Sequence, residues 1–87
     1  FADVADMLGW ALHRSGANAG AISYARQANA LGAHNSGYLF HLGMIELSLG
    51  RNADARRDLS AALALNPHFS PLDAPAATAA LHRLGPR

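Results

Sequence analysis

Apolar side chains near the start of the chain recur three or four residues apart, which is the spacing of one face of an α-helix. They are Val4, Leu8, Ala11 and Leu12. The pattern stops at Ser15-Gly16, where glycine favours the left-handed turn that closes many helices. The sequence therefore predicts a first helix that ends just before Gly16.

Three further apolar faces follow, each with the same helical spacing. The second face comprises Ala21, Ile22, Ala25 and Ala28. The third comprises Leu39, Leu42, Ile45 and Leu49, and the fourth comprises Ala55, Leu59, Ala62 and Leu63. Gly50 separates the third face from the fourth, and Asn66-Pro67 ends the fourth because proline cannot continue a helix.

Asparagine precedes each of these three faces, at Asn18, Asn35 and Asn52. Its side-chain oxygen can accept a hydrogen bond from a free N–H in the first helical turn, so asparagine is a preferred N-cap residue. We therefore expect these three residues to cap the second, third and fourth helices.

A fifth, alanine-rich helix is expected at the C-terminal end. Ser70-Pro71 is typical of a helix start, but Pro75 disfavours a regular helix that begins so early, because proline lacks the N–H. We expect the helix to run from near Ala74 to about Leu84 and to end at Gly85-Pro86. Its packing side is predicted to comprise Leu72, Ala76, Ala80 and Leu84.

The sequence contains an internal repeat. The chain matches itself without a gap when it is shifted by about 34 residues. Small and apolar residues account for most of the coincidences. The matching pairs include Leu8 with Leu42, Gly9 with Gly43, Gly16 with Gly50, Ala21 with Ala55, Ala28 with Ala62 and Leu31 with Leu65. A period of about 34 residues is typical of helix–turn–helix repeats that stack side by side.

These residues resemble the tetratricopeptide repeat family. The resemblance is strongest over the second unit, at Leu39, Leu42, Gly43, Gly50, Ala55, Leu59, Ala62, Leu65 and Pro67, and weaker over the first. Ala5, Ala33 and Glu46 depart from the family pattern, which places Trp, Pro and a large aromatic there. The resemblance implies an all-α fold, an α-α superhelix of antiparallel helix pairs with about five helices.

The resemblance also implies one domain over residues 1–87. Repeat one is expected at about 2–35, repeat two at about 36–69 and a capping helix at about 70–84. Since three or more repeats are normally needed for stability, we expect the chain to be part of a longer array.

Members of this family bind a peptide or a partner's helix in a concave groove lined by the first helix of each pair. Transferred by position, the groove-lining residues are Asp3, Asp6, Trp10 and His13 in repeat one, and Gly37, Phe40, Met44 and Leu47, with His41 beside them, in repeat two. These are not the Lys, Arg and Asn residues with which the family's best-known groove binds a C-terminal carboxylate. An apolar, aromatic groove with an acidic edge is expected, with core packing as the alternative for Trp10, Phe40 and Met44.

A second surface is expected on the first helix, because no repeat precedes it in this sequence. It comprises Phe1, Val4, Met7 and Ala11. We expect upstream repeats or a second copy of the chain to cover it.

Composition excludes several classes of protein. The net charge is +1, and Asp54 and Asp58 interleave with the densest basic run, so the basic stripe of a nucleic-acid-binding protein is missing. No stretch is long and apolar enough to span a membrane, and the absence of cysteine excludes disulfides and thiolate zinc sites. The expected protein is soluble, and its compartment stays open.

Candidate chemistry is sparse. Glu46 is the sole glutamate and stands within an apolar helix, where we expect a salt bridge or hydrogen bond to Arg or Tyr. None of the five histidines pairs with another at the three- or four-residue spacing that chelates a metal from one helix face. We expect no enzyme activity, no cofactor and no metal, but a scaffold that binds a protein or peptide. A homo-oligomerisation module, or a helical accessory subdomain of a larger protein, is the alternative.

Overall fold

The structure is a computed structural model that describes residues 1–85. Within these residues the chain forms five helices and no strand, so the all-α prediction is confirmed. The helices are α1 (Ala2–Arg14), α2 (Asn18–Leu31), α3 (Ser36–Ser48), α4 (Asn52–Leu65) and α5 (Asp73–Leu84).

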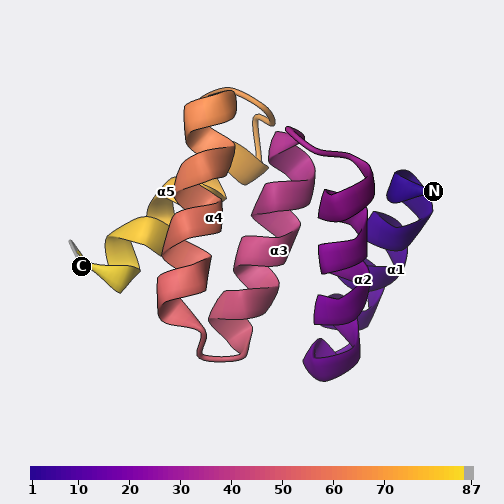
Figure 1. Cartoon of the computed structure of the whole chain (residues 1–87). Coiled ribbons are helices and arrows are strands. Elements are labelled where there is room, and N and C mark those ends of the chain that lie inside the picture. Colours follow the sequence, from indigo (N-terminus) through magenta and orange to yellow (C-terminus); the bar gives the residue numbers. More distant parts are fainter. Residues whose placement is uncertain (86–87) are drawn as a thin grey trace.

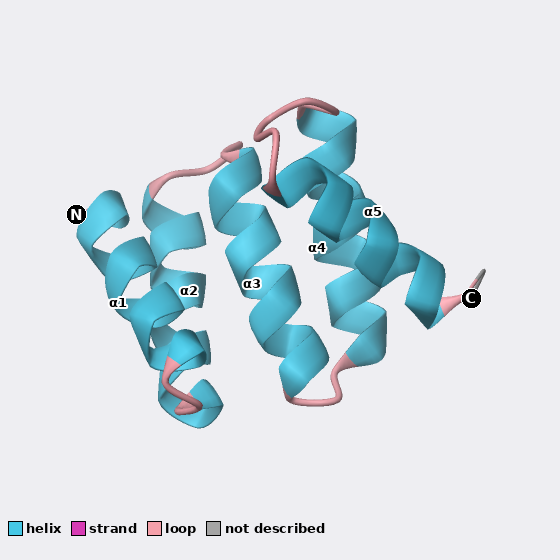
Figure 2. Cartoon of the chain, turned by 180° about the vertical axis from the view of Figure 1, so that it is seen from behind, coloured by secondary structure: helices cyan, strands magenta, loops and turns pink. Residues whose placement is uncertain are grey.

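The helices are arranged as antiparallel neighbours in chain order. α1 pairs with α2 and α3 with α4, while α2 packs on α3 and α5 packs on α4 (Figure 1). The connections lie alternately at the two ends of the helices (Figure 2). α1 and α5 therefore occupy opposite ends of a stack that measures 32 × 24 × 20 Å.

Two clusters of buried side chains hold the stack together. The first joins the two helix pairs, because Leu42 and Ile45 of α3 pack against a stripe of small and apolar residues on α2. That stripe comprises Ala21, Ile22 and Ala25. The second cluster joins α3, α4 and α5 and contains Phe40, Leu59, Ala62, Ala77 and Ala80. Alanine on one side of each contact lets the helix axes approach closely, so that the larger residues opposite are fully covered.

Glycine permits an equally close approach within each pair. A Cβ atom added at Gly43 would lie 2.7 Å from Cγ of Leu59 on α4, and one added at Gly9 would lie 3.1 Å from the carbonyl oxygen of Ala21 on α2. Gly9 and Gly43 occupy the same position in successive repeats. The repeat thus places glycine where the two helices of each pair cross.

The asparagine caps differ from one another. Asn35 caps α3 as predicted, since its Oδ1 accepts a hydrogen bond from the Tyr38 N–H at 3.0 Å. The prediction was wrong for Asn18 and Asn52. Each is already the first residue of its helix, and neither α2 nor α4 has a side-chain cap. Gly16 and Gly50 form tight turns with positive φ just before these helices. The helices therefore begin at the asparagine itself, one residue earlier than expected for an asparagine N-cap.

The buried face of α5 agrees only in part with the predicted one. Ala74, Ala77 and Ala80 are buried, whereas Leu72 precedes the helix and is 79% exposed. On the predicted side, Ala80 is buried and Ala76 is partly buried against the second cluster, so the observed face is rotated from the predicted one and overlaps it. The reason is the close contact with Leu59 and Ala62 of α4, which selects small side chains on α5.

Replacing Gly43 by Ala is expected to lower the free energy of unfolding by about 1–3 kcal/mol, because the new methyl group overlaps the fully buried Leu59. Gly20→Ala is the matched control, since its added Cβ meets only ordinary contact at 3.8 Å. Removing a flexible glycine from α2 is expected to raise stability by about 0.5–1 kcal/mol. Urea denaturation measures both values, and equal effects of the two substitutions would contradict this explanation of Gly43.

Candidate functional site

Polar and aromatic side chains of α1 and α3 meet across the boundary between the two helix pairs. His41 Nδ1 lies 2.7 Å from Oδ1 of Asp6, a hydrogen-bond distance. The indole of Trp10 stacks on the same imidazole, with ring centroids 4.1 Å apart and planes 22° from parallel. Asp6 and Trp10 lie four residues apart on one face of α1, so both reach a single ring on α3.

Further rings extend this contact into an aromatic cluster, which comprises Trp10, His13, Phe40, His41 and Phe69. Trp10 lies 4.9 Å from His13 and 5.9 Å from Phe40 between ring centroids, and Phe40 lies 5.8 Å from Phe69. Phe40 is 2% exposed, while the other four rings are half-buried. Phe40 thus forms the floor of the cluster, as the core-packing alternative requires, and Trp10, His13 and His41 form its accessible part.

The remaining residues expected in the groove lie beside this cluster. Met44 and Leu47 are half-buried and pack on the second core cluster. Asp3 is exposed and accepts a hydrogen bond from the hydroxyl group of Tyr38, which raises the pKa of Tyr38 to about 12. Tyr38 was not among the expected residues, because helical spacing does not show which side chains of α1 and α3 are opposite one another.

A polar cleft of about 600 Å³ opens next to His41, between the first turns of α3 and α5 and the end of α4. Gly37 lines it, as do three residues of the α4–α5 connection and the start of α5 that carry polar side chains. These three are Asn66, Ser70 and Asp73. Sequence reasoning missed them because the path of a connection cannot be read from helical periodicity.

The residues expected on the second surface all lie exposed on α1 or directly before it. We call the set Phe1, Val4, Met7 and Ala11 the N-terminal face. The helix α1, which carries most of this face, lies at the end of the stack opposite α5 (Figure 1). Leu8 and Tyr24, which are also partly exposed, adjoin the N-terminal face in a shallow pocket with Phe1 and Val4.

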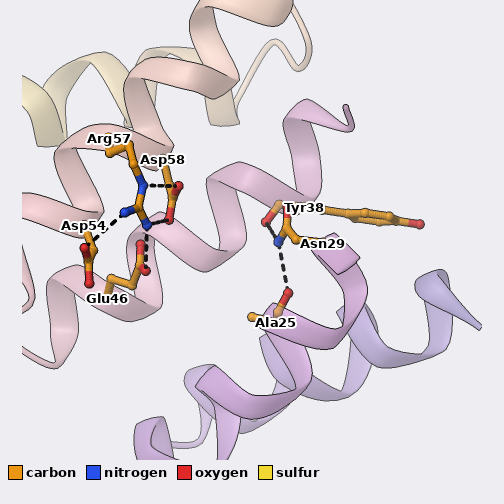
Figure 3. Close-up of polar contacts among 7 residues, drawn as sticks. All are labelled: Ala25, Asn29, Tyr38, Glu46, Asp54, Arg57 and Asp58. Carbon is orange, nitrogen blue, oxygen red and sulfur yellow. Dashed lines mark hydrogen bonds and ion pairs between the residues drawn. The ribbon is translucent and has the colours of Figure 1, made fainter. Parts of the chain in front are cut away.

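Glu46 is buried between α3 and α4 and is 1% exposed. Its Oε2 lies 3.9 Å from Nη2 of Arg57, whose guanidinium also pairs with Asp54 and Asp58, while its Oε1 has no hydrogen-bond partner (Figure 3). Burial and the neighbouring Asp58 carboxylate raise the pKa of Glu46 to about 8. The expected pairing with arginine is therefore present, but it is long and leaves half of the carboxyl group unpaired.

Asn29 forms a further polar contact between the two helix pairs. Its side-chain amide donates to the carbonyl oxygen of Ala25 at 2.9 Å and to that of Tyr38 at 3.1 Å (Figure 3). One side chain thus bonds the backbones of α2 and α3. This contact fixes the relative position of the helix pairs that present Trp10 and His41.

Other kinds of site find no support in the part of the chain that the structure describes. Residues 1–85 contain no group of three or more His, Cys, Asp or Glu side chains placed to hold a metal ion. Within the same residues, no helix has the length and hydropathy needed to cross a membrane.

Comparison with known proteins gives one match. Residues 36–69, which contain α3 and α4, match a family model described as Tetratricopeptide repeat. Neither the curated proteins nor the solved structures provide a match. Several glycine and alanine positions of this segment recur one repeat earlier, in α1 and α2.

Stability is expected to fall as the pH rises from about 4.5 to about 8, because the folded state keeps a proton on Glu46 that the unfolded chain has lost. The slope from this group reaches ~1.4 kcal/mol per pH unit when the two states differ by one proton. Glu46→Gln, which stays neutral, is expected to flatten the curve and to be more stable than the wild type at pH 8.

Urea denaturation of both proteins across this range measures the effect. Every other ionisable group is present in both proteins, so the difference between the two curves isolates Glu46. Parallel curves of unfolding free energy against pH for the two proteins would show that Glu46 does not cause the fall in stability.

Proposed function

Because the chain is a repeat protein of the tetratricopeptide type, whose members are protein–protein interaction modules, we propose that it binds a peptide or a partner's helix on the exposed side of the aromatic cluster. The binding surface would comprise Trp10, His13, His41, Met44 and Leu47, with Asp3 and Asp6 at its edge. Gly37 and the polar cleft would extend it toward α5.

The observation that carries this proposal is the position of Trp10. The indole is half-buried, and contacts with His13, Phe40 and His41 hold it from several directions. A fixed, partly accessible tryptophan offers a large contact area at little entropic cost, and tryptophan is enriched among the residues that dominate binding energy at interfaces.

The hydrogen bond between Asp6 and His41 supports a positioning role. In a hydrolase, an Asp–His pair activates a third group that bonds to the other imidazole nitrogen. Here the imidazole is covered on one face by Trp10, and its described side-chain hydrogen bond is to Asp6. Repeats of this family are typically scaffolds that lack catalysis, so we assign the pair to the orientation of α1 against α3.

Self-association and an accessory role within a larger protein are the alternatives. Light scattering after size exclusion, over a concentration series from low micromolar upward, separates them from the proposal. A molar mass equal to that of one chain at every concentration would agree with a surface that binds a different molecule. A concentration-dependent dimer that Trp10→Ala dissociates would show that the cluster binds a second copy instead.

Truncation of the proposed surface is expected to weaken peptide binding. Ligands are first selected from a phage-displayed library of random peptides, and their Kd is measured by fluorescence anisotropy. Trp10→Ala and Leu47→Ala are expected to raise the Kd at least about fivefold, which corresponds to ~1 kcal/mol or more.

The matched control is Leu31→Ala, which removes the same atoms from an exposed position at the end of α2. Its Kd is expected to equal that of the wild type. Selection of no peptide with a Kd below ~1 mM would overturn the proposed function. An equal rise in Kd for Leu47→Ala and Leu31→Ala would show that the binding surface lies elsewhere.

A further inference from the structure

The polar cleft next to His41 has room for a long side chain of a ligand. Its volume of about 600 Å³ lies within the range of ~300–1,000 Å³ that is common for ligand pockets. Its walls come from segments distant in the sequence, namely the first turn of α3, the end of α4, the α4–α5 connection and the start of α5. The fold thus brings these segments together around one space.

Asp73 is the carboxylate in the lining of this cleft. It stands in the first turn of α5 and is half-buried. Asp3 and Asp6 of α1 accept hydrogen bonds from Tyr38 and His41, whereas within residues 1–85 the Asp73 carboxylate has neither a hydrogen bond nor an ion pair. A carboxylate that has lost part of its hydration gains from a cationic hydrogen-bond donor.

The helix starts at the cleft are poorly suited to an anion. Ser70 accepts the Asp73 N–H through its hydroxyl group and the Ala74 N–H through its carbonyl group, each at 3.0 Å. At the start of α3, the Tyr38 N–H donates to Oδ1 of Asn35. First-turn N–H groups are what a helix start offers to an anion, and these already have acceptors within the chain.

The end of α4 favours a cation in the same place. This helix ends at Leu65, and both Leu65 and Asn66 line the cleft. The last carbonyl groups of a helix have no partners within it and form the negative end of the helix dipole. A positive group in the cleft therefore meets two sources of negative potential, the Asp73 carboxylate and the end of α4.

The charged side chains around the cleft have one sign. Histidine apart, those in the first halves of α1, α3 and α5 are Asp3, Asp6 and Asp73. The arginines of residues 1–85 lie elsewhere, on α2, at the start of α4 and in the last turns of α1 and α5: Arg26, Arg51, Arg56, Arg57, Arg14 and Arg83. A basic ligand is therefore attracted to the end of the molecule where the cleft opens.

An aromatic wall favours arginine among the basic side chains. Phe69 lines the cleft, and its half-buried ring lies 5.8 Å from that of Phe40 between centroids. A guanidinium can stack on an aromatic ring and also give two parallel hydrogen bonds to one carboxylate. The ammonium group of lysine cannot form this two-bond contact.

We propose that the peptide or helix bound on the aromatic cluster carries an arginine, whose guanidinium enters the polar cleft and pairs with Asp73. His41 joins the two places, because its ring stacks on Trp10 and also lines the cleft. One ligand segment therefore reaches both, with an apolar residue on Trp10 and the arginine a few residues away. This inference names the chemistry of the partner, and it rests on the proposed function.

Peptides selected from the phage-displayed library test the inference. The selected sequences are expected to share an arginine at a fixed spacing from a large apolar residue. The tightest-binding peptide is then synthesised both with this arginine and with glutamine in its place. Fluorescence anisotropy measures the Kd of each peptide for the wild type and for Asp73→Asn.

For the arginine peptide, Asp73→Asn is expected to raise the Kd about fivefold or more, because it removes the charge from a half-buried pair. For the glutamine peptide, the same substitution is expected to leave the Kd unchanged, because the pair is already absent. Asparagine keeps the shape of the side chain, so the comparison isolates the charge.

Asp54→Asn is the matched control. Asp54 stands in the first turn of α4 as Asp73 does in that of α5, so both substitutions remove a similar interaction with a helix dipole. Asp54 pairs with Arg57 at 3.3 Å and does not line the cleft, so the Kd of both peptides is expected to stay unchanged. The comparison of the two peptides on the wild-type protein tests the inference even where a variant is unstable.

Failure of the inference can be told apart from failure of the proposed function. Peptides that Trp10→Ala weakens, but that lack arginine or bind Asp73→Asn as tightly as the wild type, would refute the inference and leave the proposed function intact. Acidic peptides that bind more tightly to Asp73→Asn would show that the cleft takes an anion. Selection of no peptide would overturn both.

Discussion

The close approach of neighbouring helices is the constraint on which the rest of the structure depends. Gly9 and Gly43 remove the Cβ where the two helices of each pair cross, and Ala21 and Ala25 keep the side chains short between the pairs. Because the side chains at these crossings are small, few large residues are needed to fill the core. Trp10, His13 and His41 therefore stay partly exposed where α1 packs against α3.

The helices and their order were predictable from the sequence because they depend on local spacing. Apolar residues three or four apart, glycine at the turns and the internal repeat are all visible in the chain itself. The caps were less predictable. Asn35 caps a helix and Asn18 does not, because the tight turn at Gly16 begins α2 one residue early. The buried face of α5 depended on what α4 presents to it.

The members of the candidate site were predictable only in part, and their pairing was not predictable. Position in the repeat placed Asp6, Trp10 and His41 on the same surface, yet it gave no sign that one imidazole would contact both other groups. That contact depends on the register between α1 and α3, which Asn29 and the packing of α2 on α3 determine. Phe69 and the polar cleft depend on the α4–α5 connection, whose path follows no periodic pattern.

Each helix packs mainly on the helices next to it in the chain, and this has a consequence for how the molecule forms. Contacts between segments close in sequence require short loops to close, which costs little entropy, so rapid folding is the natural outcome. Nucleation in either helix pair can then spread to its neighbour. The end helices α1 and α5 each have a packing partner on one side only, so thermal opening would begin there and reach α3 last.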